Sequence, residues 1–257
     1  MRFVGVDGCA NGWVAVNLTD EQCEVSFFQT IGLLWDTFGQ ETTLMLIDMP
    51  IGLPTGGDQR ERMCDVMAKQ YLGKRGSSIF PAPCRELLQP IPYTEANDRT
   101  RKLTGKGLSK QTFNLLPKIR ELDTFHQHNP SIWNKIHESH PELLYQVLAG
   151  SRSVHSKKDA TGVLQRLDLL STLIDITGQL FPAIRHSSNQ LKGVKPDDLI
   201  DACVLAVTAR LSSQQGLESV SEIRQFDALG LPMEIVLTKS MMDSIKTRTT
   251  SSKDQNM

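Results

Sequence analysis

Two acidic residues stand where the sequence leaves an apolar segment. Asp7 closes the run RFVGVD immediately before Gly8, and Asp48 ends LMLID immediately before a segment rich in proline and glycine. A carboxylate in such a position is costly to bury unless a cation or hydrogen-bond donors accompany it. Asp-Gly is also a turn signal, so Asp7 has a structural interpretation as well. For Asp48 we favour a role in a site.

A third acid lies in the segment HESHPE. Alternation along a strand places Glu138 and His140 on one face, whereas Pro141 and Glu142 fit the first turn of a following helix. We therefore expect Glu138 to be the ligand and Glu142 to be a helix-end acid. His140 could orient a water or substrate, or it could cap the helix.

Two more acids, Asp198 and Asp201, lie three residues apart near the start of an apolar helical segment, so both face one stripe. Stabilisation of the helix dipole would explain either acid alone. Hard divalent cations such as Mg²⁺ and Mn²⁺ prefer oxygen ligands, and two-metal phosphodiester chemistry needs several carboxylates. The predicted catalytic and metal-binding set is therefore Asp7, Asp48, Glu138, Asp198 and Asp201.

Basic and hydroxyl side chains gather between residues 50 and 130. The stretch 99–120 has several basic residues and no acidic one. Arginine suits bidentate contacts to phosphate, while a solvated surface is the alternative for the lysines. The apolar loop SSIFPAP should hold Arg75 and Arg85. The predicted substrate contacts are Arg75, Ser77, Ser78, Arg85, Lys106, Ser109, Gln111, Lys118 and His140.

The elements that must position these residues follow a β-β-β-α-β order. Strands are predicted over 2–8, 12–18 and 23–30 as an antiparallel meander, a helix over 31–39, and a buried strand over 43–50. After the insertion of about 50–130 come a short strand near 135–141 and helices over 142–150 and 162–176. Asp197 is expected to cap a helix over 198–213. Residues 233–237 fit an edge strand, and 238–257 a disordered tail.

The composition places bounds on the function. Hydrophobic residues make up 39%, charged residues 22%, and the net charge is -1, which disfavours a non-specific nucleic-acid coat protein. The five scattered cysteines indicate neither disulfides nor a zinc knuckle. There is no membrane-spanning run and no signal-peptide pattern, so we expect a cytoplasmic location. We expect one domain over 1–237; the oligomeric state is not predicted.

The motifs GVDGCANGW, IDMPIGLP, RERMCD, LGKRGSSIFPAPCRE, GKGLSKQTFNLLPKIRELD, HPE and DDLIDA occur in this order. Together they resemble the predicted RNase H-like nuclease family catalogued as domain of unknown function 429. The resemblance implies an α/β fold, with an RNase H-like mixed five-stranded sheet flanked by helices and a large insertion after the fourth strand. It also implies an acidic cluster of Asp7, Asp48, Glu138 and Asp198 or Asp201. The nuclease label of that family rests on fold analogy.

We therefore expect a nuclease or phosphodiesterase that depends on Mg²⁺ or Mn²⁺ and acts on DNA or RNA. One alternative is a non-catalytic nucleic-acid-binding or regulatory protein on the same fold. Another is a phosphotransferase of the related actin-like fold. The second alternative is weaker, because no hydroxyl residue directly follows Gly8 and no second glycine-rich phosphate loop follows residues 44–48.

Overall fold

The computed structural model describes residues 1–150 and 152–254, and the chain divides into two compact units. The sheet unit is formed by Met1–Asp48, Lys135–Glu218 and the chain from Val236 onward. The insert unit is formed by Met49–Asn134 and Ser219–Ile235. Its first segment spans the stretch in which the sequence predicts an insertion of about 50–130. The single-domain organisation stays a prediction.

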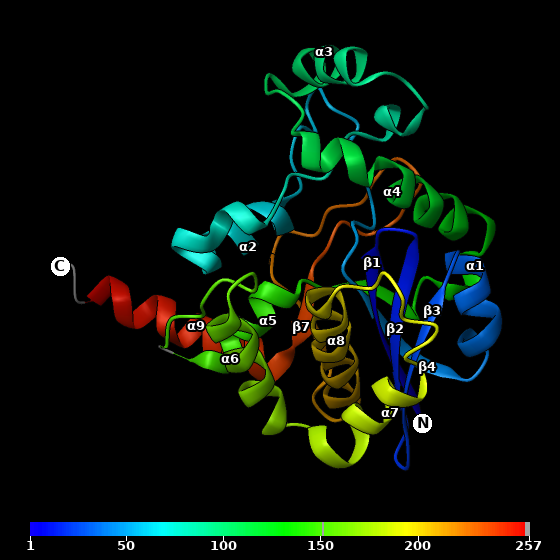
Figure 1. Cartoon of the computed structure of the whole chain (residues 1–257). Helices are drawn as coiled ribbons and strands as arrows, with labels where there is room; N and C mark the ends of the chain where they lie inside the picture. Colours follow the sequence, from blue (N-terminus) through cyan, green and yellow to red (C-terminus); the bar gives the residue numbers. More distant parts are fainter. Residues whose placement is uncertain (151, 255–257) are drawn as a thin grey trace. The chain divides into compact units, whose positions relative to one another are not determined.

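The sheet unit is built on a mixed five-stranded sheet in the order β3-β2-β1-β4-β5, of which Figure 1 labels β1 to β4. Its strands are β1 (Arg2–Cys9), β2 (Gly12–Leu18), β3 (Cys23–Phe28), β4 (Thr42–Ile47) and β5 (Ile136–Glu138). The first three strands form the expected antiparallel meander, and β4 and β5 continue the sheet in parallel. The predicted α/β class and five-stranded mixed sheet are confirmed.

Helix α8 (Pro196–Gln215) packs directly on the face of β1 (Figure 1). Gly5 makes the close approach possible, because a Cβ atom there would lie 2.0 Å from the carbonyl oxygen of Ala202 and 2.2 Å from the backbone nitrogen of Ala206. Side chains alternate along a strand, so Asp7 lies on the same face as Gly5. The fold therefore turns the end of β1 toward the first half of α8.

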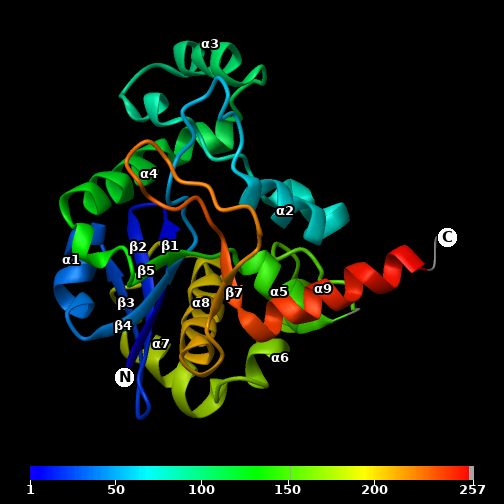
Figure 2. The ribbon, with the colours of Figure 1, turned by 180° about the vertical axis from the view of Figure 1, so that it is seen from behind.

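The remaining helices of the sheet unit surround this pair. After β3 come α1 (Ile31–Leu34) and the π-helical turn η1 (Trp35–Gly39), and after β5 comes α5 (Pro141–Ala149). Helix α9 (Lys239–Asp254) packs against α5 (Figure 2). The other elements are α6 (Ala160–Ser171), η5 (Ile176–Leu180), α7 (Phe181–His186), and the small sheet of β6 (Leu217–Ser219) and β7 (Val236–Thr238).

Three local expectations differ from the structure. The helix expected over 162–176 ends at Ser171. Helix α8 begins at Pro196 with Lys195 as N-cap, so Asp197 lies inside the first turn and is not the cap. The expected disordered tail is helical over Lys239–Asp254, because Met241, Met242 and Ile245 are buried; residues 255–257 lie outside the described part of the chain.

The insert unit is largely helical. Ser109 begins its longest helix by accepting a hydrogen bond from the Thr112 backbone nitrogen, and Gly105, with φ of 77°, ends the helix before it. A buried ion pair between Arg62 and Asp65 (2.5 Å) supports its first helix. Its helices are α2 (Met63–Leu72), η2 (Gly73–Ser78), η3 (Arg85–Leu88), α3 (Tyr93–Thr104), α4 (Lys110–His128) and η4 (Pro130–Ile132).

Among the described residues, no single helix has both the length and the apolar character needed to cross a membrane. One bent pair, Ala160–Ser171 with Ile176–His186, meets those criteria jointly by length and composition alone.

Candidate functional site

Three carboxylates meet at the end of the central strands of the sheet unit. Asp7 belongs to β1 and Asp48 directly follows β4, and the Asp48 backbone nitrogen donates to the carbonyl oxygen of Val6 at 3.0 Å. This parallel pairing puts both side chains on the face that carries α8. Asp201 reaches them from the second turn of that helix. One carboxylate oxygen from each of the three residues lies within 4.8 Å of the other two.

This carboxylate cluster (Asp7, Asp48 and Asp201) has few hydrogen-bond donors. Asp7 is 8% exposed and accepts from the Gly8 backbone nitrogen at 2.7 Å. Asp201 is 1% exposed, and its Oδ2 accepts from the Lys157 ammonium at 2.5 Å. Its Oδ1 atom is buried and has no hydrogen-bond partner within the described residues. A buried carboxylate oxygen without a donor or a cation is energetically unfavourable.

The pKa values of the three acids and of Lys157 are shifted by burial and by their charged neighbours. Burial, and next the charges of Asp48 and Asp201, raise the pKa of Asp7 well above its usual range. Burial also raises the pKa of Asp48, against the opposing effects of His140 and Lys157. For Asp201, burial raises the pKa to about 7 despite the Lys157 ion pair. Burial lowers the pKa of Lys157, but the charge and hydrogen bond of Asp201 outweigh it, so the net shift is upward.

The carboxylate cluster fits a divalent cation. Three oxygen ligands come from separate rigid elements, and the unpartnered Oδ1 of Asp201 is an acceptor that a hard cation would satisfy. Burial is the main cause of the raised pKa of each acid, and neighbouring carboxylates add to it. A bound cation would oppose both effects.

The structure does not bring Glu138 into the carboxylate cluster. Glu138 pairs with Ile47 in the parallel ladder, so its side chain lies on the same face as that of Ile47 and opposite to that of Asp48. Strand β5 ends at Glu138, so the predicted alternation does not extend to His140, and the register places Ser139 rather than Glu138 beside Asp48. The Ser139 hydroxyl donates to the Val236 carbonyl oxygen at 2.7 Å.

Asp198 also lies outside the three-residue group. It occupies the third position of α8, where a carboxylate oxygen accepts from the Lys195 backbone nitrogen at 3.1 Å as part of a capping box. Its charge still contributes to the raised pKa of Asp7, as the smallest of the stated causes. The helix-end interpretation therefore describes Asp198, while Asp201 belongs to the carboxylate cluster.

Glu142 is more than the helix-end acid expected from the sequence. It is buried in α5, and both of its carboxylate oxygens accept from Arg166 Nη2, at 2.8 and 2.9 Å. The Arg166 guanidinium also lies 5.2 Å from the ring centre of Tyr145. The charge of Glu142 contributes to the raised pKa values of Asp48 and Asp201. Next to it, His140 is the N-cap residue of α5 but makes no side-chain capping bond.

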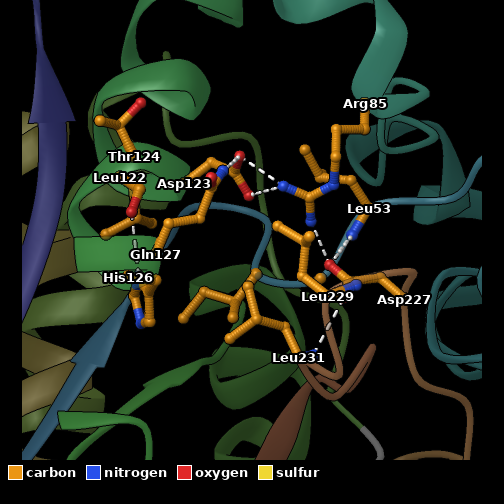
Figure 3. Close-up of polar contacts among 12 residues, drawn as sticks. Leu53, Arg85, Leu122, Asp123, Thr124, His126, Gln127, Asp227, Leu229 and Leu231 are labelled. Carbon is orange, nitrogen blue, oxygen red and sulfur yellow. Dashed lines mark hydrogen bonds and ion pairs between the residues drawn. The ribbon is translucent and has the colours of Figure 1, made fainter. Parts of the chain in front are cut away.

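Arg85, a predicted substrate contact, forms two ion pairs within the insert unit, and its contact with a substrate stays a prediction. Its side chain is 19% exposed, and its guanidinium pairs with two buried acids, Asp123 and Asp227 (Figure 3). Asp227 additionally accepts from the backbone nitrogens of Leu53, Leu229 and Leu231. Both terminal nitrogens of Arg85 therefore donate to acids, while its Nε is buried and has no hydrogen-bond partner among the described residues.

The other predicted substrate contacts of the insert unit have varied surroundings. Lys106 forms an exposed ion pair with Glu61, and Ser109 caps α4. The Ser78 hydroxyl donates to the Arg75 carbonyl oxygen at 2.9 Å. Ser77 and Gln111 are exposed, and Arg75 and Lys118 are partly buried. Contacts of these residues with a substrate stay a prediction.

Sequence reasoning missed Lys157 and Arg166. Lys157 lies in a polar connection and Arg166 in the helix predicted over 162–176, and no strand end or motif distinguishes either from surface lysines and arginines. The amphipathic pattern of that helix would place Leu164 inward, whereas the structure exposes Leu164 and buries Arg166. Nothing in the sequence indicates that Lys157 meets Asp201 across 44 residues.

Comparison with known proteins gives one match. The family model described as "Protein of unknown function (DUF429)" matches residues 5–222, so the chain belongs to this family. No curated protein and no solved structure matches the chain. The family assignment covers β1 through α8 and therefore every member of the carboxylate cluster.

Proposed function

We propose that the protein is a divalent-metal-dependent phosphodiester hydrolase acting on nucleic acid, with Asp7, Asp48 and Asp201 as its metal ligands. The observation that carries this proposal is the meeting of three largely buried carboxylates from β1, β4 and α8, with oxygens within 4.8 Å of one another. The unpartnered Oδ1 of Asp201 supports a cation over a purely structural network. Mg²⁺ and Mn²⁺ are the cations whose ligand preference fits best.

When bound, such a cation would lower the pKa of a bound water and stabilise the charge that develops on a phosphodiester. The fold of the sheet unit fixes the positions of the three carboxylates. Asp7 and Asp48 are fixed by paired strands, and Asp201 by a helix in contact with the same sheet. Lys157 holds one oxygen of Asp201. Rigid ligands of this kind keep the cation in place while the substrate changes.

Nucleic acid is the proposed substrate class because the insert unit is rich in basic and hydroxyl side chains. Arg75, Lys106 and Lys118 are the main candidates for contacts to phosphate, because the two terminal nitrogens of Arg85 already pair with Asp123 and Asp227. A net charge of -1 is compatible with such local contacts. The proposal covers DNA and RNA alike.

The test uses the purified full chain with single-stranded, duplex, hybrid and branched DNA and RNA. Cleavage is expected with Mg²⁺ or Mn²⁺ and not after chelation. Asp48→Asn should reduce the rate by at least about 100-fold, because a metal ligand is lost. The exposed Asp36 in η1 provides a matched control, since Asp36→Asn should retain the full rate. Cleavage of none of these substrates, or full activity of Asp48→Asn, would contradict the proposal.

A further inference from the structure

Lys157 is a built-in cation of the carboxylate cluster. Its ammonium lies 2.5 Å from Oδ2 of Asp201 and 3.9 Å from Oδ2 of Asp197, and its side chain is 31% exposed. Its charge also opposes the raised pKa of Asp7 and of Asp48. Lys157 therefore interacts electrostatically with all three carboxylates while making its direct bond to one oxygen.

The segment that carries Lys157 is fixed by α6. Gln165 accepts from the backbone nitrogen of His155 at 2.8 Å and donates to the carbonyl oxygen of Ser153 at 2.8 Å. A Cβ atom at Gly162 would lie 1.9 Å from the carbonyl oxygen of Ser156, so the helix runs against the segment with no space for a side chain. These contacts hold the residues on the N-terminal side of Lys157.

Arg166 links the same segment to the core. It donates from Nη1 to the carbonyl oxygen of His155 at 2.9 Å and from Nη2 to the buried carboxylate of Glu142. Because Arg166 is 1% exposed, this link is part of the packed interior. Lys157 is therefore presented to Asp201 by a rigid segment, unlike a surface lysine that finds an acid by chance.

The two oxygens of Asp201 have different surroundings. Oδ2 carries the Lys157 ammonium, whereas Oδ1 is buried and has no partner among the described residues. Three ionised carboxylates and one ammonium leave two net negative charges, which a single divalent cation neutralises. A second divalent cation, which two-metal sites hold about 4 Å from the first, would have to lie beside the Lys157 ammonium on Asp201 and would be repelled by it.

We propose that Lys157 takes the place of the second cation, so that the site binds a single divalent ion through Asp7, Asp48 and Oδ1 of Asp201 while Lys157 remains on Oδ2. This inference rests on the metal site of the proposed function and adds its stoichiometry. It also makes Lys157 a positioning residue, which orients Asp201 and supplies fixed positive charge beside the ion.

The test measures how many Mn²⁺ ions the full chain binds at pH 8. Calorimetry and the paramagnetic resonance signal of free Mn²⁺ both give this number. The wild type should bind one ion at the site. Lys157→Met removes the charge at similar length and should bind a second ion. Lys158→Met is the matched control, because Lys158 is the exposed neighbour, and it should bind one ion.

Two ions bound by the wild type, or one ion bound by all three proteins, would overturn the inference while leaving a metal-dependent activity possible. If the wild type binds no ion, the metal site itself fails, and the proposed function fails with it. Lys157→Gln serves as a second neutral variant if Lys157→Met does not fold. If either neutral variant cleaves substrate while still binding only one ion, Lys157 does not replace the second cation.

Discussion

The carboxylate cluster of the sheet unit and the Arg85 network of the insert unit are two ways of burying acids. The Arg85 guanidinium forms ion pairs with both Asp123 and Asp227, and Asp227 also accepts hydrogen bonds from three backbone nitrogens (Figure 3). In the carboxylate cluster, three acids share one lysine, and one oxygen of Asp201 has no partner among the described residues.

The difference separates a structural network from a candidate site. An acid can be buried at little cost when hydrogen-bond donors or cations contact its carboxylate oxygens. Those oxygens are then not free to bind a ligand. A cluster with too few donors costs free energy in the absence of a ligand, and it therefore indicates that a cation is expected there. The count of donors around each buried acid, more than burial itself, distinguishes the two regions.

The largest expected effect comes from exchanging one acid in each region. Asp201→Asn should weaken Mn²⁺ binding by more than about 100-fold, because it removes a ligand charge from the carboxylate cluster. Asp227→Asn is the matched change in the insert unit and should leave Mn²⁺ affinity within about twofold of the wild type. Calorimetric titration measures both. Equal losses in the two variants would remove the distinction between the regions.

Breaking the Arg85 network should affect stability and not metal binding. Arg85→Met leaves Asp123 and Asp227 buried without their cation, which costs about 3–5 kcal/mol in the free energy of unfolding. The exposed Arg101 in α3 gives the control, since Arg101→Met should change that free energy by no more than about 0.5 kcal/mol. Urea denaturation followed by circular dichroism compares them. A stable Arg85→Met protein would show that the network is dispensable.

The approach of α8 to β1 can be tested with glycine substitutions. Gly5→Ala introduces a Cβ atom 2.0 Å from backbone of α8, so the helix must shift, at a cost of about 3 kcal/mol and with weaker Mn²⁺ binding. In Gly32→Ala of α1, the new Cβ atom would lie 3.8 Å from the Thr30 hydroxyl oxygen, an ordinary contact, so this change should be neutral or slightly stabilising. Thermal denaturation with and without Mn²⁺ separates the two. Unchanged metal binding in Gly5→Ala would disconnect α8 from the site.

A smaller effect is expected in the pH dependence of stability. The pKa of Asp201 is raised from 3.8 to about 7, so the folded protein binds more protons than the unfolded chain between these values. Raising the pH through this window therefore lowers the free energy of unfolding of the metal-free protein. Asn does not titrate, so the stability of the wild type relative to Asp201→Asn should fall by about 3 kcal/mol from pH 4 to pH 7. A difference independent of pH would contradict the shift.

Much of the fold was predictable because its signals are local. The apolar runs at 2–8, 12–18 and 43–50 and the acids that end two of them are visible in the sequence, and the structure places Asp7 and Asp48 side by side. The position of Asp201 on an inward helix stripe was equally visible. These signals depend only on period and on neighbours along the chain.

What could not be predicted depends on register and on distant partners. The face of Glu138 is set by its pairing with Ile47, and a register different by one residue would have put it beside Asp48. Arg85 finds its acids 38 and 142 residues away, and Lys157 finds Asp201 44 residues away. Single-sequence patterns carry no information on such pairs.

The most direct test of the carboxylate cluster as a metal site is anomalous diffraction from crystals soaked in Mn²⁺. The account predicts one strong anomalous peak within coordination distance of Asp7, Asp48 and Asp201, with the Lys157 ammonium still on Asp201. The absence of a peak at these three side chains at saturating Mn²⁺, or a peak bound only by other acids, would contradict it.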